Sequence, residues 1–389
     1  MVTDVVVVGL GYTGLTMAVA AARGGRNVVG LDSSSVRVAE IIAGTPGCGL
    51  AAVSDAELAG LLTGSLKVQA DSPPQAGVHM LCVPSRDLVG AVDVVAGSLR
   101  HGDLVIIQST CPPGFIDEVV IPRLRQHTKA RVNVVHSPVR LDPGRDRSIG
   151  VPRVIAGATA ECLSAGMRFL GDLGEQMVPV SSIRAAELTK VFENTFRLVN
   201  ISLVNELAAV CRGFGVAVAE VLAAAATKPY GFLRHEPGPG AGGDCVPVCA
   251  EFFAEAAGRH GCLAESVEAA IAVNNAIPRN IMGQLSLRGR RVVVAGVTYK
   301  PDVADVRRSA AVRLLEELKA QTEVAYHDPY VPQLRLRDGT VLRSTPVAPG
   351  VADVVLLVTR HLKMDISGFG ASVIDCSSGF PCAVRTHDA

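Results

Sequence analysis

A cysteine at the end of a glycine-rich run is the first residue of this chain whose setting suggests covalent chemistry. Cys245 follows Pro237-Gly-Pro-Gly-Ala-Gly-Gly-Asp, and glycines at this density allow the backbone to approach a ligand closely. Backbone N–H groups in such a loop can stabilise a thiolate, which makes Cys245 a candidate nucleophile. The alternative interpretation is a buried structural cysteine after a flexible loop.

A lysine and an asparagine stand four residues apart in a stretch with apolar residues at helical spacing. We expect Lys190 and Asn194 to lie one helical turn apart on the same face. A partly buried lysine beside an amide can bind a substrate alkoxide or relay a proton. By spacing alone, an exposed lysine on an amphipathic helix is the simpler alternative.

The N-terminal segment has the pattern of a dinucleotide-binding turn. Gly9, Gly11 and Gly14 match G-x-G-x-x-G between an apolar strand and a helix, which is the context that the pattern requires. Asp32 ends the next strand, where a carboxylate can bind the ribose hydroxyls and repel a 2′-phosphate. The combination favours NAD over NADP, although Arg37 weakens that preference. The alternative is a glycine turn that binds nothing.

A third polar segment follows the glycine turn of a later strand. It contains Tyr299, Lys300, Asp302, Asp305, Arg307, Arg308 and Ser309. These residues could form a phosphate or sugar clamp, or merely a solvated turn.

Alternating strands and helices are expected to position the N-terminal residues. The predicted strands are Asp4–Val8, Asn27–Leu31, His79–Val83, Leu104–Gln108, Val132–His136 and Arg153–Ala156. Helical stretches, such as Thr13–Arg23, lie between most of them. This alternation predicts an α/β fold with a parallel, doubly wound sheet, which is a Rossmann domain.

The pattern changes at Ile183 and then returns. Ala185–Phe214 predicts a long central helix or a helix pair, Lys228–Val248 a loop, and 250–275 further helix, with Pro278 marking a break. Strands are expected again after Arg290 and at Thr322–Tyr326, Asp353–Val358 and Ser372–Asp375. The predicted domains are an NAD-binding Rossmann domain (1–182), a central helical domain (183–285) and a C-terminal Rossmann-like domain (286–389).

The composition of the 389 residues excludes several classes of partner. Hydrophobic residues make up 49%, and 37 basic residues balance 37 acidic ones, so neither nucleic acid nor an anionic membrane is expected as a partner. We recognise no signal peptide and no membrane span, and expect a cytoplasmic protein. The ten cysteines lack zinc-like spacing, so free thiols and no metal are expected. Cys48, Cys82 and Cys376 are interpreted as core residues, and His136 and His327 as structural histidines.

Together these segments resemble the UDP-glucose/GDP-mannose dehydrogenase family, the nucleotide-sugar 6-dehydrogenases. GLGYTGLTMA, QSTCPPG, AELTKVFENTFR and VVVAGVTYKPDVADVR follow the family's order, and the resemblance covers nearly the whole chain. The run from Lys228 to Pro247 most resembles the branch acting on UDP-N-acetylhexosamines. The resemblance implies NAD-dependent oxidation of the C6 alcohol of a UDP-N-acetylhexosamine or UDP-hexose to a uronate. It also implies a homodimer joined through the central helices.

The resemblance further implies roles for individual residues. Cys245 matches the nucleophile that forms a thiohemiacetal and then a thioester, and Lys190 and Asn194 match residues that hold the C6 oxygen. Thr110 matches a hydroxyl that helps to position the catalytic water. The implied cofactor-binding positions are Gly9, Gly11, Tyr12, Thr13, Gly14, Asp32, Arg37, Val83, Ser85, Ser109, Thr110 and Arg307. The implied substrate-binding positions are Arg140, Leu141, Lys190, Asn194, Arg197, Gly238, Gly240, Gly242 and Lys300.

Four positions depart from the family pattern. Val139 replaces the Glu associated with activating the hydrolytic water, Cys249 replaces an Asp four residues after the nucleophile, and Gln108 replaces a Glu seen in many relatives. Asp244 replaces a small residue or a His, and its charge should disfavour the Cys245 thiolate. The loss of a general base typically reduces the rate roughly 10²–10⁴-fold.

Three hypotheses remain open from the sequence. The first is the ordinary four-electron oxidation, with Asp244 or another group replacing the lost base. The second is a two-electron oxidation that stops at the C6 aldehyde, or a redox-neutral change through transient oxidation. The third is a non-catalytic relative that binds NAD or a nucleotide sugar.

Overall fold

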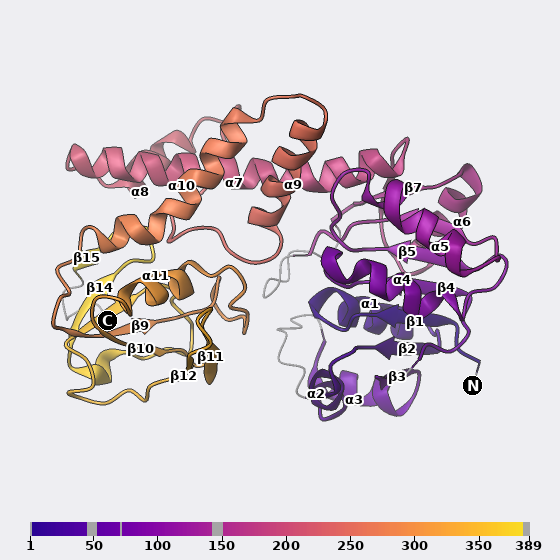
Figure 1. Ribbon diagram of the computed structural model, residues 1–389, viewed down its shortest axis with the longest axis horizontal. Coiled ribbons are helices and arrows are strands. Elements are labelled where there is room, and N and C mark those ends of the chain that lie inside the picture. Colours follow the sequence, from indigo (N-terminus) through magenta and orange to yellow (C-terminus); the bar gives the residue numbers. More distant parts are fainter. Residues whose placement is uncertain (1, 45–52, 71, 142–150, 384–389) are drawn as a thin grey trace. The chain divides into compact units, whose positions relative to one another are not determined.

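The computed structural model describes residues 2–44, 53–70, 72–141 and 151–383, and the chain divides into two compact units, 1–192 and 193–389 (Figure 1). None of the helices in those described ranges has the length and apolarity that a bilayer crossing demands.

An eight-stranded sheet of order β3-β2-β1-β4-β5-β6-β7-β8 forms the centre of the first unit (Figure 1). Its strands are β1 (Val5–Val8), β2 (Val28–Leu31), β3 (Leu66–Gln69), β4 (Val78–Leu81), β5 (Leu104–Ile107), β6 (Asn133–His136), β7 (Arg153–Gly157) and β8 (Met177–Pro179). The predicted parallel arrangement is confirmed from β3 to β6. β7, however, runs antiparallel to β6. This direction was not predicted, because a short apolar run in the sequence indicates a buried strand but not the direction in which it runs. The short strands β3 and β8 were not predicted.

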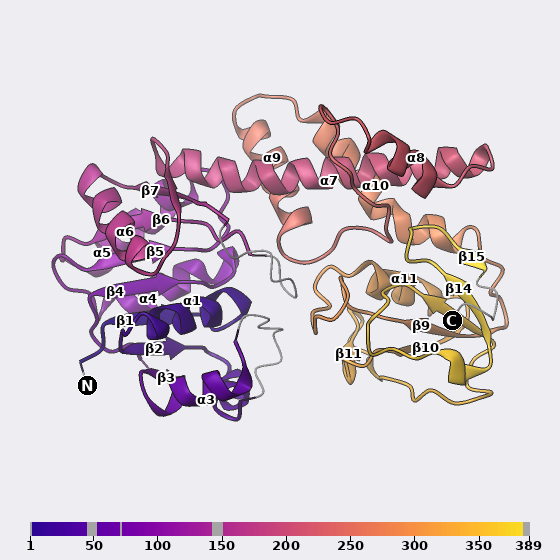
Figure 2. The ribbon, with the colours of Figure 1, turned by 180° about the vertical axis from the view of Figure 1, so that it is seen from behind.

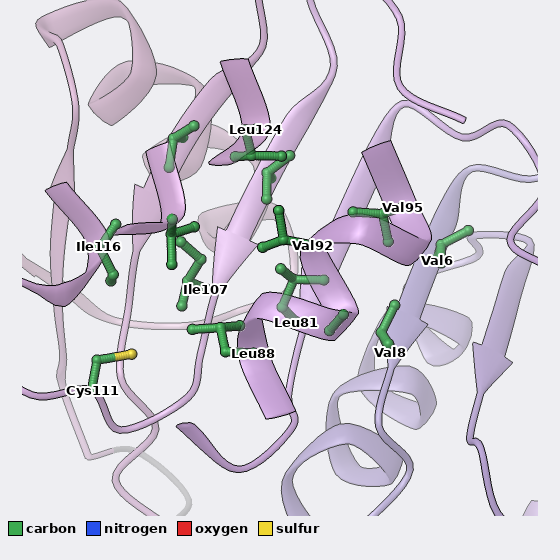
Figure 3. Close-up of a cluster of buried hydrophobic side chains, with 14 of the residues drawn as sticks. Val6, Val8, Leu81, Leu88, Val92, Val95, Ile107, Cys111, Ile116 and Leu124 are labelled. Carbon is green, nitrogen blue, oxygen red and sulfur yellow. The ribbon is translucent and has the colours of Figure 1, made fainter. Parts of the chain in front are cut away.

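Helices cover both faces of this sheet. One face bears α4 (Leu88–Ala96) and α5 (Ile121–His127); the other bears α1 (Tyr12–Arg23), α2 (Ser35–Ile42), α3 (Asp55–Thr63) and α6 (Ala160–Asp172). Side chains of β1 alternate between them, so that Val6 and Val8 join the cluster around α4 (Figure 3), whereas Val5 and Val7 join the other. Burial on both faces explains why β1 consists of four consecutive valines.

A single helix, α7 (Ile183–Gly213), confirms the predicted long central helix. α8 (Val218–Ala225), α9 (Val246–Arg259) and α10 (Glu265–Met282) follow. The predicted break at Pro278 is wrong, because α10 continues through it. Pro278 has no N–H to donate to the carbonyl of Asn274 one turn earlier, so α10 loses one hydrogen bond of its ladder there without ending.

A five-stranded sheet of order β10-β9-β13-β14-β15 forms the core of the second unit (Figure 2). Its strands are β9 (Arg291–Ala295), β10 (Glu323–His327), β13 (Val354–Leu357), β14 (Ser372–Asp375) and β15 (Cys382–Ala383). All are parallel except β15, which confirms the predicted Rossmann-like arrangement. α10 and α11 (Ala310–Leu318) pack on one face. The short hairpin of β11 (Gln333–Arg335) and β12 (Val341–Arg343) was not predicted.

Candidate active site

The glycine turn after β1 has the geometry that a dinucleotide requires. Gly9 has φ +86°, and a Cβ on Gly14 would lie 1.7 Å from the carbonyl oxygen of Gly9, so a side chain cannot be accommodated at either position. Next to Gly11 the space is open, with nothing within 4 Å of an added Cβ. α1 begins directly after Gly11, and a helix start at this place favours the phosphates of a dinucleotide.

Asp32 lies at the end of β2, beside this turn. Its Oδ2 accepts a hydrogen bond from the N–H of Leu10 and its Oδ1 from that of Ser34, both at 2.9 Å. Each carboxylate oxygen can accept a second bond, so the ribose hydroxyls of NAD can still be held there. Arg37 donates from Nε to the carbonyl of Leu10 at 3.1 Å, which fixes the guanidinium beside the turn. This edge of the sheet therefore fits NAD.

Other predicted cofactor residues follow the neighbouring strands β4 and β5. Ser109 Oγ donates to the carbonyl of Val83 at 2.6 Å and so ties the two strand ends together. Ser85 begins a 3₁₀ turn after β4, and Thr110 is half-buried after β5. These residues, like Gly9 after β1, lie at the carboxyl ends of parallel strands, where open α/β sheets bind ligands.

Val139 follows β6 at the same edge and is half-buried, as are Arg140 and Leu141. Arg140 donates from Nη1 to the carbonyl of Pro152 at 2.6 Å. Val139 thus places at this edge an apolar side chain that can neither accept a proton nor hold a water.

A buried carboxylate that the sequence analysis did not identify supports the loop after Thr110. Glu187 is fully buried on α7, and its carboxylate accepts the N–H groups of Gly114 at 2.6 Å and Ile116 at 3.0 Å. Burial raises the pKa of Glu187 to about 7, although the two N–H donors oppose that shift. Lys190 lies three residues further along α7 and is only 9% exposed. In the sequence, the signal for this buried carboxylate was that Glu187 occupies a helical position where an apolar residue is expected.

Cys245 is exposed at the N-terminal end of α9, where the glycine loop ends. The loop needs its glycines because it packs tightly against the segment after β9. A Cβ on Gly242 would lie 2.8 Å from the carbonyl oxygen of Arg308, and Gly243, with φ +79°, donates to the carbonyl of Arg307 at 2.8 Å. The sequence predicted that the backbone of this loop approaches a ligand closely. In the structure, the group that it approaches is the backbone of Arg307 and Arg308.

Two buried asparagines fix the glycine loop. Asn274 accepts the N–H of Ala241 at 2.6 Å and donates to the carbonyl of the same residue at 3.1 Å. Asn205 accepts the N–H of Gly238 at 2.9 Å. Neither asparagine was singled out from the sequence, where an amide among apolar helical positions was the only signal.

The structure brings Asn194 to the first turn of α9. Its Nδ2 donates to the sulfur of Cys249 at 3.2 Å, and Cys249 is fully buried. The N–H of Cys249 in turn donates to the carbonyl of Cys245 at 3.1 Å. Asn194 is thereby held one helical turn from the candidate nucleophile, with Lys190 one turn earlier on α7.

Asp244 forms an ion pair with Arg307, from Oδ2 to Nη1 at 2.6 Å. Arg307 also pairs with Asp305, and the hydrogen bonds with these carboxylates raise the pKa of the guanidinium. Asp244 therefore does not stand beside Cys245 as an isolated charge, because it shares the Arg307 guanidinium with Asp305. Its effect on the Cys245 thiolate stays a prediction.

The turn that contains Lys300 is held by a buried polar network. Thr298 Oγ1 donates to the carbonyl of Lys300 at 2.9 Å, and the N–H of Asp302 donates to Nδ1 of His361 at 2.9 Å. Nε2 of the fully buried His361 lies 3.1 Å from Oδ2 of Asp328. A histidine that accepts at Nδ1 has its proton on Nε2, which makes His361 the donor to Asp328.

The cysteines and histidines that were interpreted as structural residues differ in how deeply they are buried. Cys376 is fully buried and Cys82 half-buried, and burial raises the pKa of each thiol to about 12. Burial lowers the pKa of His136 to about 4, and its Nδ1 bonds the carbonyl of Ile107, but Nε2 lacks a partner among the described residues. His327 bonds the carbonyl of Thr345 through Nδ1. Cys48 lies outside the described residues.

Three models of the UDP-glucose/GDP-mannose dehydrogenase family match the chain in order. The NAD binding domain matches residues 3–169, the central domain 184–276 and the UDP binding domain 293–370. The chain belongs to this family. The three matched ranges cover most of the 389 residues. They include the glycine turn, Asp32 and Cys245.

Similar proteins of this family cover almost the whole chain. A UDP-N-acetyl-D-glucosamine 6-dehydrogenase from Pseudomonas aeruginosa is 32% identical, over 94% of this chain and 92% of its own length. An NDP-N-acetyl-D-galactosaminuronic acid dehydrogenase from Ralstonia nicotianae is 28% identical, over 97% and 96%. The solved structure of a UDP-D-ManNAc dehydrogenase from Pyrococcus horikoshii has a TM-score of 0.82 at 27% identity, covering 97% of this chain and 96% of that one.

Membership of the UDP-glucose/GDP-mannose dehydrogenase family makes this chain an NAD-dependent oxidoreductase, as the glycine turn and Asp32 predicted. The third hypothesis, a non-catalytic relative, is therefore set aside.

Proposed function

We propose that the chain oxidises the C6 alcohol of a UDP-N-acetylhexosamine or UDP-hexose to the uronate through a covalent intermediate on Cys245. The observation that carries this proposal is the exposed Cys245 at the start of α9, with the Asn194 amide fixed over the first turn of the same helix. The choice of sugar is supported by the relatives from Pseudomonas aeruginosa and Ralstonia nicotianae, whose names specify N-acetylated hexose derivatives.

In the first oxidation, Asn194 and Lys190 hold the C6 oxygen. The amide donates a hydrogen bond to that oxygen, and the lysine removes the hydroxyl proton as the alcohol becomes an aldehyde. NAD supplies the hydride acceptor, and two molecules are needed for the two oxidations. Arg140, Leu141, Arg197, Lys300 and the loop glycines Gly238, Gly240 and Gly242 are proposed to bind the rest of the substrate.

In the second oxidation, the Cys245 thiolate adds to the aldehyde carbon. A C–S bond forms, and the carbonyl oxygen takes a proton to give a thiohemiacetal. Loss of a hydride and a proton then gives a thioester. Water, positioned with the help of Thr110, adds to the thioester carbon; the C–S bond breaks, the thiolate leaves and the uronate is released.

Asp244 is proposed to replace the family carboxylates that are Val139 and Cys249 in this chain. It is half-buried, adjacent to Cys245, and fixed in direction by Arg307 at 2.6 Å. A carboxylate with one oxygen on a guanidinium keeps further acceptor sites for a water. Asp244 therefore serves as the general base for thioester hydrolysis.

One observation favours a second candidate function. At the position of the family Asp, the Cys249 sulfur receives the Asn194 amide in a buried site, and a thiol there activates no water. If Asp244 does not act as the base, the reaction stops at the C6 aldehyde, or it returns the hydride in a redox-neutral change.

A homodimer through the central helices is proposed from the exposed apolar face of α7. Phe196, Leu203 and Val210 follow one another at intervals of seven residues and are 44%, 61% and 55% exposed, and Phe214 is 81% exposed. Seven-residue spacing places them along one helix face, and such an apolar stripe is typical of a helix–helix interface.

The division into domains at 182/183 and 285/286 stays a prediction.

Product analysis of the wild type and of Cys245→Ser tests the proposed function. The wild type should form the uronate. Cys245→Ser should form none, because serine cannot provide the thioester, while oxidation of the alcohol to the aldehyde should persist. A uronate formed by Cys245→Ser would show that a thioester on Cys245 is not required.

A further inference from the structure

The second unit contains a pocket of about 490 Å³ between the glycine loop, α10, the first turns of α11 and β11. This volume is in the usual range for small-molecule sites, roughly 300–1,000 Å³. Of the side chains that line it, four are arginines, Arg308, Arg313, Arg335 and Arg337, whereas one, Glu316, is a carboxylate. The pocket is therefore strongly positive.

Two of these arginines have carboxylate partners and two do not. Arg337 pairs with Glu316 at 3.0 Å, and Arg308 pairs with Glu251 at 2.6 Å. Arg313 and Arg335 form no ion pair with any residue that the structure describes. Arg313 donates from Nη1 to Oδ1 of Asn275 at 2.8 Å, but its buried Nε has no acceptor in the described chain.

The environment of Arg313 is electrostatically unfavourable as it stands. Burial, together with the nearby charges of Arg337 and Arg308, lowers the pKa of its guanidinium. A buried donor without an acceptor adds a further cost. An anion in the pocket would neutralise the repulsion among the arginines, and a rotation of the Arg313 side chain toward that anion would also bring Nε to an acceptor.

The walls of the pocket favour an organic anion over a simple ion. Val306, Val312 and Leu334 supply apolar surface, and Asn275 supplies an amide that can contact a ring or a hydroxyl. The start of α11 offers little to a ligand, because the Ser309 hydroxyl already accepts its N–H groups. Recognition would therefore come from the guanidinium groups, which match phosphate in charge and geometry.

We infer that this pocket is a second ligand site, which binds a phosphate-bearing metabolite of the nucleotide class and acts on the Cys245 loop. None of the side chains proposed to bind substrate or NAD lines it. The inference concerns a different site from the proposed reaction and does not depend on how the thioester is hydrolysed.

The glycine loop connects the pocket to Cys245. Ala241 lines the pocket and is held at both backbone polar groups by Asn274, and Pro247, two residues after Cys245, lines it as well. Gly242 packs against the carbonyl of Arg308, which has a positive φ of 52°. A ligand that moves Arg308 or Ala241 must therefore displace the loop that ends at Cys245.

The first test measures pyrophosphate binding by isothermal titration calorimetry, on the full chain saturated with NAD. Arg313→Gln should weaken binding roughly tenfold, and Arg335→Gln roughly three- to tenfold, as expected for the loss of a charge-assisted contact. Arg343→Gln, on the partner strand of the same hairpin and outside the pocket, is the matched control and should leave binding unchanged. Equal affinities for all four proteins would overturn the inference, as would KM values for the sugar that rise in parallel with the loss of pyrophosphate binding.

The second test follows alkylation of Cys245 by iodoacetamide, with peptide mapping. Pyrophosphate should change the rate at Cys245 at least twofold in the wild type and not in Arg313→Gln. Cys262 is also exposed and serves as an internal control whose rate should stay constant. A Cys245 rate that responds equally in both proteins would show that pyrophosphate acts elsewhere.

Discussion

The side-chain amide of Asn194 donates a hydrogen bond to the sulfur of Cys249 across 3.2 Å. A carboxylate at the position of Cys249 could both orient the amide and act on water. A thiol sulfur is a weak acceptor, so in this chain it can only orient the amide. We therefore propose that this pair separates the holding of the C6 oxygen from the activation of water.

Substitution of the two partners should have unequal effects on activity. Asn194→Ala removes a donor to the reacting oxygen and should lower kcat roughly 10²–10³-fold. Cys249→Ala removes only a weak support for that donor and should lower kcat/KM less than about tenfold. Steady-state kinetics of both variants checks this. If Cys249→Ala were as damaging as Asn194→Ala, the thiol would itself be part of the catalytic machinery.

Asp244→Asn should slow thioester hydrolysis roughly 10²–10⁴-fold while leaving both oxidations intact. The expected result is a burst of NADH followed by a slow steady state, with an acyl group on Cys245 detectable by mass spectrometry.

Asp305→Asn is the matched control, because Asp305 also pairs with Arg307 but does not adjoin Cys245 in the chain. It should disturb Arg307 without accumulating acyl-enzyme. Acyl-enzyme in both variants would mean that the position of Arg307, rather than the Asp244 carboxylate, governs hydrolysis.

The stability of the first unit should depend on the protonation of Glu187. Its folded pKa of about 7 lies above its unfolded value near 4.5, so the stability it contributes is complete below pH 4.5 and is lost as pH rises through 7. Relative to Glu187→Gln, the wild type should lose about 2.5 kcal/mol of unfolding free energy between pH 5 and pH 8.

Denaturant unfolding followed by circular dichroism measures this difference, since the chain has no tryptophan. His136 titrates in the opposite direction, because its lowered pKa destabilises the fold in acid, but it is present in both proteins and cancels. A difference that stays constant from pH 5 to pH 8 would contradict the assignment to Glu187.

Leu203→Glu should convert the proposed dimer to a monomer, because it places a charge in the middle of the apolar stripe on α7. Sedimentation velocity at several protein concentrations measures the outcome. Leu263→Glu is the control, since Leu263 is 85% exposed and lies outside α7. A wild type that is monomeric throughout, or two variants that behave alike, would contradict the proposed interface.

The parts of this molecule that follow from local sequence were predicted well. A pattern within a few neighbouring residues is enough to predict the Rossmann strands, the glycine turn with Asp32, and the long helix α7. The end of α10 was missed because a proline removes one hydrogen bond of a helix without necessarily ending it. The direction of β7 was missed because a short buried strand has the same apolar pattern whether it runs parallel or antiparallel to its neighbour.

Contacts between distant segments could not be read from the sequence. The charge of Asp244 was expected to oppose the thiolate, and only the fold shows that its ion-pair partner is Arg307, 63 residues later. Glu187, Asn274 and His361 support the site through partners far along the chain, so no local spacing indicated them. The arginine pocket likewise depends on the glycine loop, α11 and β11 coming together.

The number of NADH molecules formed per sugar consumed tests the central claim most directly. Purified protein is incubated with NAD and each of a panel of UDP-sugars, N-acetylated and plain, and the product is identified by mass, with Cys245→Ser in parallel. We expect two NADH and a uronate from the wild type, and at most one NADH and an aldehyde from Cys245→Ser. One NADH with an aldehyde from the wild type, or a changed sugar with no net NADH, would contradict it.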